Sequence, residues 1–203
     1  MFTSSYLSAS QTVGPFFHDA LLREGAHTPI LINAETVGER LRIEGRVLDG
    51  AGQGVEDALV EIWQANSAGR YNHPLDGRDL PLDPTFSGFG RTATDPKGCF
   101  WFETIRPGPV PFAESVLQAP HICVAIFGRG LLNHLYTRIY FADDPAIERD
   151  PILLRVPSDR RHTLLASRHD VAGRTVYQLD LLLQGAAETV FFNLGGDVSP
   201  SNL

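Results

Sequence analysis

The clearest pattern along the chain is an alternation of polar and apolar positions that begins at Arg40. Small or apolar residues occupy every second position after it: Leu41, Ile43, Gly45 and Val47. A period of two is typical of a strand with one buried face. Further segments rich in β-branched and aromatic residues are predicted to be strands: Ala58–Gln64, Cys99–Ile105, His121–Phe127, His134–Phe141, Thr175–Gln184 and Thr189–Asn193. Short strands separated by Gly, Pro and Asp, with almost no helix, predict an all-β fold of the β-sandwich type.

The remaining segments lack this period. Residues 1–39 are predicted to form an extended N-terminal arm with one short helix near His18–Arg23, and Asp159–Ser167 is also predicted to be helical. The stretch Gly69–Gly98, rich in Pro, Asp and Gly, is too long for an ordinary connection, and long loops are usually functional or disordered. We therefore expect an arm (1–39), a β-sandwich core (40–194) and a flexible C-terminal tail (195–203).

Composition narrows the possible functions. The chain has 203 residues, 43% hydrophobic and 20% charged, which suits one folded domain, and its net charge of −7 argues against nucleic acid as a partner. The longest apolar run, Ile122–Phe127, is far shorter than the roughly 18 residues that span a membrane. The opening MFTSSYLSAS has no basic segment followed by an apolar one, so we expect a cytoplasmic protein. Cys99 and Cys123 are expected to be free thiols.

Two residues at predicted loop–strand junctions are of types that bind a hard, oxidised metal such as Fe(III). Tyr71 follows the strand EIWQA, and His121 opens the strand HICVAIF. A competent site needs three or four protein ligands. The turn Arg106–Phe112 offers only Val110, and Cys123, two residues after His121 on the same face, offers a thiol that hard iron does not prefer. From the residues alone, a packed tyrosine and a buried histidine are favoured over a metal site.

Several separated segments, in order, resemble the intradiol ring-cleavage dioxygenase family. They are SQTVGPFFH, EIWQANSAGRYNH, LPLDPTFSGFGRTATDPKGCFWFETIRPGPVPF, IFGRGLLNHLYTRIYF, RRHTLLASR and ETVFFN, and together they extend over residues 8–194. A catalytic chain of that family carries GRY, GPYPW and RPAHIHF, whose two tyrosines and two histidines bind Fe(III). The resemblance implies the β-sandwich of that family and the cleavage of a catechol ring by O2.

The resemblance also identifies positions where this chain departs from the family. Tyr71 matches the first tyrosine and His121 the first histidine, whereas Val110 replaces the second tyrosine and Cys123 the second histidine. Gln118 stands in place of the family's active-site arginine. The resemblance therefore implies vestigial ligand positions, with no metal and no catalytic residue in this chain alone.

Such departures are similar to those of the α-type chains of the family, which pair with an iron-binding β-type chain. The resemblance implies a higher hetero-oligomer of α/β pairs in which the partner's Fe(III) cleaves protocatechuate with O2 to 3-carboxy-cis,cis-muconate. It implies that Thr12, Gly14 and Pro15 border the partner's pocket and that Arg129, between two glycines, points at the substrate carboxylate. The chain alone is expected to be inactive.

Two other interpretations stay open on the sequence. The chain is also compatible with a transthyretin-like β-sandwich module that binds a ligand or has a structural role without catalysis. A further alternative is a homo-oligomeric enzyme with a metal site made by Tyr71, His121 and Cys123. A neighbouring gene that encodes GPYPW and RPAHIHF would favour the α-type interpretation over the transthyretin-like module. Metal analysis of the chain expressed alone would test the homo-oligomeric enzyme.

Overall fold

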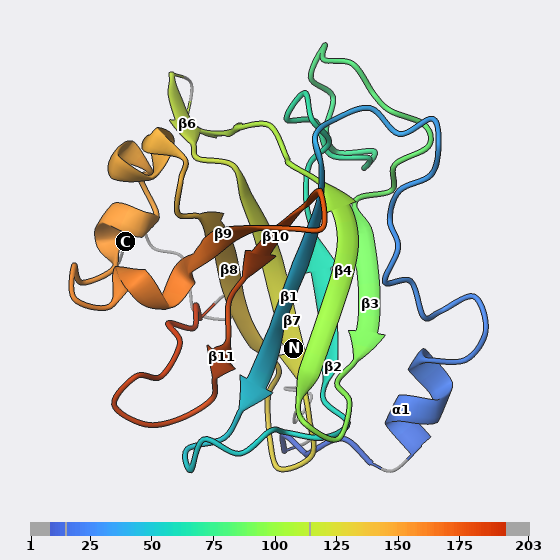
Figure 1. Ribbon diagram of the computed structural model, residues 1–203, viewed down its shortest axis with the longest axis vertical. Helices are drawn as coiled ribbons and strands as arrows, with labels where there is room; N and C mark the ends of the chain where they lie inside the picture. Colours follow the sequence, from blue (N-terminus) through green and yellow to red (C-terminus); the bar gives the residue numbers. More distant parts are fainter. Residues whose placement is uncertain (1–8, 15, 114, 194–203) are drawn as a thin grey trace, which may run out of the picture.

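Strands dominate the computed structural model, which describes residues 9–14, 16–113 and 115–193 (Figure 1). One α-helix, α1 (Phe16–Leu21), precedes the strands β1 (Arg40–Leu48), β2 (Leu59–Trp63), β3 (Phe89–Ala93), β4 (Cys99–Ile105), β5 (Val110–Ala113), β6 (Val116–Gln118), β7 (His121–Phe127), β8 (Leu135–Phe141), β9 (Leu165–Val171), β10 (Arg174–Gln178) and β11 (Leu181–Leu182). Short 3-10 helices lie between β8 and β9: η1 (Pro145–Arg149), η2 (Leu153–Arg155) and η3 (Arg161–Leu164). Among the described residues, no helix is long and apolar enough to span a membrane.

The strands form two layers that are joined at β9. One layer is antiparallel and runs β3-β2-β7-β8. In the other layer β1 pairs antiparallel with β4 and parallel with β10 and β11. Strand β9 pairs with β8 at its start and with β10 further along, so it links the two layers, while β5 and β6 form a separate hairpin (Figure 1). This arrangement confirms the predicted all-β sandwich.

Alternate residues of both layers build the core between them. Ile43 of β1 lies opposite Phe102 of β4, and Ile62 of β2 lies opposite Val124 of β7; all four side chains are buried. Because successive side chains of a strand point to opposite faces, the odd-numbered residues of β7 from Cys123 onward point away from this core. That parity places Cys123 on the outer face of the β3-β2-β7-β8 layer.

A buried carboxylate organises a second, smaller cluster beside the sandwich. The apolar members of the cluster are Ala119, Tyr140, Leu153, Val156 and Leu164. The side chain of Asp150 is fully buried and accepts hydrogen bonds from the Ala119 N–H (2.8 Å), the Tyr140 hydroxyl (3.0 Å) and the Leu153 N–H (2.7 Å). Buried charge is tolerated where it is hydrogen-bonded in this way. Asp150 thereby attaches the 3-10 segment to β8 and to the residue pair before β7.

Most of the predicted strands are confirmed, and two have the predicted bounds, Cys99–Ile105 and His121–Phe127. The predicted strand Thr175–Gln184 divides into β10 and β11. Between them the Asp180 carboxylate accepts the Arg46 N–H (2.9 Å) and pairs with its guanidinium. The predicted strand Thr189–Asn193 is wrong: these described residues make one isolated bridge, between Phe192 and Tyr136.

Two other predictions about secondary structure are wrong. The predicted helix Asp159–Ser167 is a 3-10 turn followed by β9, because Leu165 pairs with Tyr140 of β8 and tertiary pairing overrides the local helical spacing. The predicted loop Gly69–Gly98 contains β3, which pairs with β2 along its whole length. The helix expected near His18–Arg23 is present as α1, two residues earlier.

The second half of the predicted arm lies along the edges of both layers. The Thr28 N–H donates to the Arg91 carbonyl of β3 (2.9 Å), and the Leu31 N–H donates to the Glu103 carbonyl of β4 (2.9 Å). Leu31 is buried in the main core. The division into arm and core stays a prediction, and the predicted tail 195–203 lies outside the described residues.

Candidate functional site

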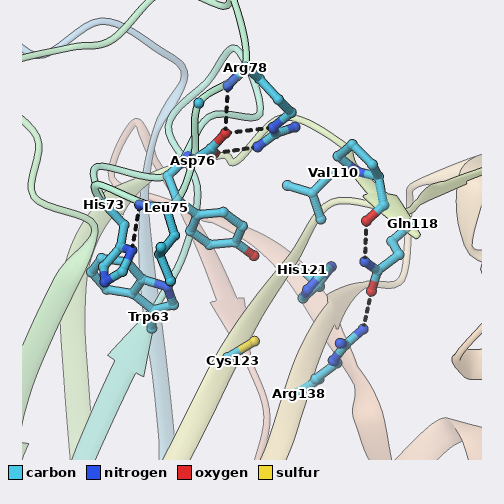
Figure 2. Close-up of a pocket in the computed structure, with 13 residues that line it drawn as sticks. Trp63, His73, Leu75, Asp76, Arg78, Val110, Gln118, His121, Cys123 and Arg138 are labelled. Carbon is cyan, nitrogen blue, oxygen red and sulfur yellow. Dashed lines mark hydrogen bonds and ion pairs between the residues drawn. The ribbon is translucent and has the colours of Figure 1, made fainter. Parts of the chain in front are cut away.

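A cavity of about 760 Å³ opens on the outer face of the β3-β2-β7-β8 layer, at the end where β7 begins (Figure 2). Its lining includes every residue that the sequence analysis assigned to the vestigial site: Tyr71, Val110, Gln118, His121 and Cys123. Four separate segments supply these residues, from the loop after β2 to β7 itself. The fold therefore brings the predicted positions together in one place.

The floor of the cavity is a row of side chains across three strands. Cys123 of β7 lies opposite Trp63 of β2 on one side and opposite Arg138 of β8 on the other. Residues in register on one face of a sheet are neighbours, which explains why the three share the cavity. The ring of Tyr71 stacks on Trp63, with centroids 5.8 Å apart and planes 10° apart. The β5–β6 hairpin places Val110 and Gln118 above this floor (Figure 2).

The loop after β2 holds Tyr71 in place through an ion pair. The Asp76 carboxylate accepts the Tyr71 N–H (2.8 Å) and pairs with the Arg78 guanidinium (2.5 Å) (Figure 2). The hydrogen bond from Arg78 holds the pKa of Asp76 well below its usual range. The loop that the sequence analysis marked as functional thus carries an ordered support for one wall of the cavity.

Arg138 is a charged residue of the cavity that the sequence analysis did not identify. Its Nη1 donates to the Gln118 Oε1 (2.7 Å) (Figure 2). The same Nη1 donates to the Tyr140 hydroxyl (3.1 Å), and that hydroxyl donates to Asp150 (3.0 Å). Both direct partners of the guanidinium are neutral side chains. The alternation of the predicted strand His134–Phe141 places Arg138 on the outer face, but only the register with β7 places it beside Cys123.

Burial keeps the potential ligands of the cavity in their neutral forms. The His121 side chain is buried, and its Nδ1 donates to the Ala119 carbonyl (2.8 Å), which leaves Nε2 as an acceptor. Burial, reinforced by the charge of Arg138, lowers the pKa of His121 to about 4. Burial also raises the pKa of Tyr71 to about 12 and raises the pKa of the Cys123 thiol. At neutral pH the cavity thus offers an imidazole, a phenol and a thiol.

These residues do not fit a ferric ion. Val110 has no donor atom, and the Cys123 thiol is a soft ligand that hard ferric iron does not prefer. The guanidinium of Arg138, which is always charged, lies in the same cavity and repels a cation. Within the described part of the chain, no group of three or more His, Cys, Asp and Glu side chains is arranged to hold a metal.

The residues predicted to serve a partner's pocket lie at the opposite end of β7. The Thr12 hydroxyl accepts the Gly130 N–H (2.7 Å), in the exposed turn that also carries Arg129. A strand of seven residues is roughly 20 Å long, so this turn is well separated from His121 (Figure 1). Gly14 is exposed, with nothing within 4 Å of the position of a Cβ, and Pro15 lies outside the described residues.

Comparisons with known proteins agree with this fold. The dioxygenase family model matches residues 13–185. The chain is 39% identical over 195 residues to the protocatechuate 3,4-dioxygenase alpha chain of Pseudomonas putida, covering 91% of this chain and 94% of that one. It is also 39% identical over 187 residues to the beta chain of the Burkholderia cepacia enzyme, covering 89% of this chain and 77% of that one.

A solved structure supports the same fold. The dioxygenase domain of a dioxygenase carbohydrate-binding protein fusion from Streptomyces sp. SirexAA-E superposes with a TM-score of 0.61 at 22% identity, covering 88% of this chain and all of that one. The chain therefore belongs to the intradiol ring-cleavage dioxygenase family. Its relatives within the family include an alpha chain and a beta chain of protocatechuate 3,4-dioxygenase.

The low pKa of His121 predicts a specific loss of stability in acid. In the unfolded chain His121 takes up a proton near its ordinary pKa of 6.5, but in the folded chain only near 4. The free energy of unfolding therefore decreases by ~3 kcal/mol in total as the pH falls from 6.5 to 4. His121→Gln should abolish this share of the pH dependence in urea unfolding, whereas His169→Gln, at an exposed position, should keep it. Identical pH profiles for His121→Gln and the unmodified chain would contradict the assignment.

Proposed function

We propose that this chain is the α-type, non-metal-binding subunit of a protocatechuate 3,4-dioxygenase and that it works beside an iron-binding β-type chain. Sequence identity alone does not decide between the two types, because both kinds of relative are 39% identical to this chain. The cavity supports the α-type: Val110 and Cys123 stand at two ligand positions, and Arg138 adds a positive charge. The greater coverage of the alpha chain's length agrees with this choice.

In this proposal, the ring-cleavage chemistry belongs to the Fe(III) of the partner. The assembly is a hetero-oligomer of α/β pairs in the cytoplasm that converts protocatechuate and O2 to 3-carboxy-cis,cis-muconate. This chain contributes the wall of the partner's pocket through Thr12, Gly14 and Pro15 in the arm and Arg129 in the turn after β7.

The arrangement at that end of β7 favours such a contribution. The hydrogen bond from Gly130 to Thr12 joins the arm to the turn, so the two candidate segments form one exposed surface. Arg129 is exposed, and among the described residues it is in no ion pair, so its guanidinium is free to pair with a carboxylate. The exposed Gly14 allows another backbone or a substrate to approach closely.

The two alternatives from the sequence are less well supported. Membership of the dioxygenase family over most of the chain argues against a transthyretin-like module without a catalytic role. The absence of a donor at Val110, the soft thiol of Cys123 and the neighbouring charge of Arg138 argue against a metal site in this chain.

The proposal predicts that iron and activity both depend on the partner. The chain expressed alone should contain no stoichiometric iron and should consume no O2 with protocatechuate, because its cavity lacks ligands. Co-expressed with a β-type chain that carries GPYPW and RPAHIHF, it should yield a complex with one iron per pair of chains. Iron analysis and O2 uptake measure both quantities. A chain that is coloured by tyrosinate-to-iron absorption in the absence of a partner would overturn the proposal.

The role of Arg129 predicts a selective effect on substrate binding. In the assembled enzyme, Arg129→Ala should raise KM for protocatechuate by ~30-fold, the effect of losing a desolvated charge pair, and leave the iron content unchanged. Catechol lacks the carboxylate and should be affected much less. Arg174→Ala removes another exposed positive charge, on β10, and serves as the control. Equal losses for both substrates would assign Arg129 to packing or assembly.

A further inference from the structure

We propose that the cavity of this chain is a binding site for a single-ring aromatic carboxylate, held by the guanidinium of Arg138. This site goes beyond the proposed function, because it lies in this chain and needs no iron. Three features carry the proposal: a cation whose direct hydrogen-bond partners are neutral, a flat aromatic wall, and a lining whose one carboxylate among the described residues is already paired.

The first feature is the state of Arg138. Some other partly buried arginines are paired with carboxylates, as Arg91 is with Glu61 (2.6 Å) and Arg106 with Asp144 (3.0 Å). Arg138 is in no ion pair among the described residues, and its Nη1 is bonded to neutral partners. Its Nε and Nη2 make no hydrogen bond within the described part of the chain. A partly buried cation with free donors attracts an anion, and the planar fork of a guanidinium matches a carboxylate in particular.

The second feature is the wall that faces this cation across the cavity floor. The stacked rings of Trp63 and Tyr71 form a flat surface on one side of Cys123, and Arg138 lies on the other side (Figure 2). An aromatic ring can stack on such a surface while its carboxylate reaches the guanidinium. The volume of about 760 Å³ lies within the range of small-molecule sites and accommodates one ring with water.

The third feature is the charge of the remaining lining. Asp76 is the carboxylate among the lining residues, and its charge is engaged by Arg78. The Nδ1 of His121 donates to the Ala119 carbonyl, which leaves Nε2 as an acceptor, and Tyr71 adds a phenol hydroxyl to the lining. The cavity thus has a net positive charge at Arg138 and neutral polar groups that can hydrogen-bond a ring hydroxyl. These are the requirements of a hydroxylated aromatic acid.

The two tryptophans of the chain allow a direct test. Trp63 lines the cavity, whereas Trp101 lies under Arg42 on the other layer and serves as an internal control. The full chain is labelled with 5-fluorotryptophan, assembled with unlabelled β-type partner where needed for solubility, and titrated with benzoate. We expect a saturable shift of the Trp63 fluorine resonance and none for Trp101. A cavity that is inert to benzoate would overturn the proposal.

Matched ligands and variants distinguish the contribution of the ligand's charge to binding from the contribution of its aromatic ring. Benzamide, the neutral analogue, should bind at least ~30-fold more weakly than benzoate, and Arg138→Met should weaken benzoate to a similar extent, because each removes one partner of a charge pair. Arg174→Met should bind benzoate with the same affinity as the unmodified chain. Inorganic phosphate that binds as tightly as benzoate would indicate a simple anion site and overturn the aromatic part. If Arg138→Met does not fold, Arg138→Lys is the second variant, because it keeps the positive charge but lacks the planar guanidinium. Arg138→Lys should bind benzoate about tenfold more weakly than the unmodified chain, and an unchanged affinity would overturn the assignment.

Discussion

The chain of hydrogen bonds from Asp150 through Tyr140 to Arg138 is the constraint on which the cavity depends. Asp150 is fully buried and binds the Tyr140 hydroxyl and the Ala119 N–H, and Ala119 in turn accepts the Nδ1–H of His121. Tyr140 lies beside the guanidinium of Arg138. One carboxylate thereby sets the positions of the imidazole and of the cation, and in a buried network the loss of one member leaves the others unsatisfied.

The Asp150–Tyr140–Arg138 hydrogen bonds explain how the proposed α-type chain can keep the framework of the family without a metal site. The walls of the cavity stay in place because β-sheet register and the Asp150 network position them, and neither depends on a metal. In the proposed α-type assignment, Val110 and Cys123 occupy ligand positions, which removes donors without removing the space. The positive charge of Arg138 then makes the same space suitable for an anion. Equal identity to alpha and beta relatives agrees with a shared framework whose functional difference lies in a few side chains.

Much of this could be predicted from the sequence, for identifiable reasons. The period of two at β1 and β7 predicted the strands and placed His121 and Cys123 on one side, and the resemblance grouped Tyr71, Val110 and Gln118 with them. Arg138 could not be found in this way, because its place beside Cys123 depends on the register between two strands, which the sequence does not encode locally. The predicted helix over Asp159–Ser167 was wrong for a related reason, since pairing with β8 and β10 determines β9.

The most direct test of the account is whether missing donors and an added charge together keep iron out of this cavity, as we propose. Val110→Tyr with Cys123→His restores four ligands with Tyr71 and His121, and adding Arg138→Met removes the opposing charge. We predict weak Fe(III) uptake by the double variant and tighter uptake by the triple variant, measured by tyrosinate-to-iron absorption under conditions that load the partner. If the folded triple variant takes up no iron, the cavity is not a modified metal site.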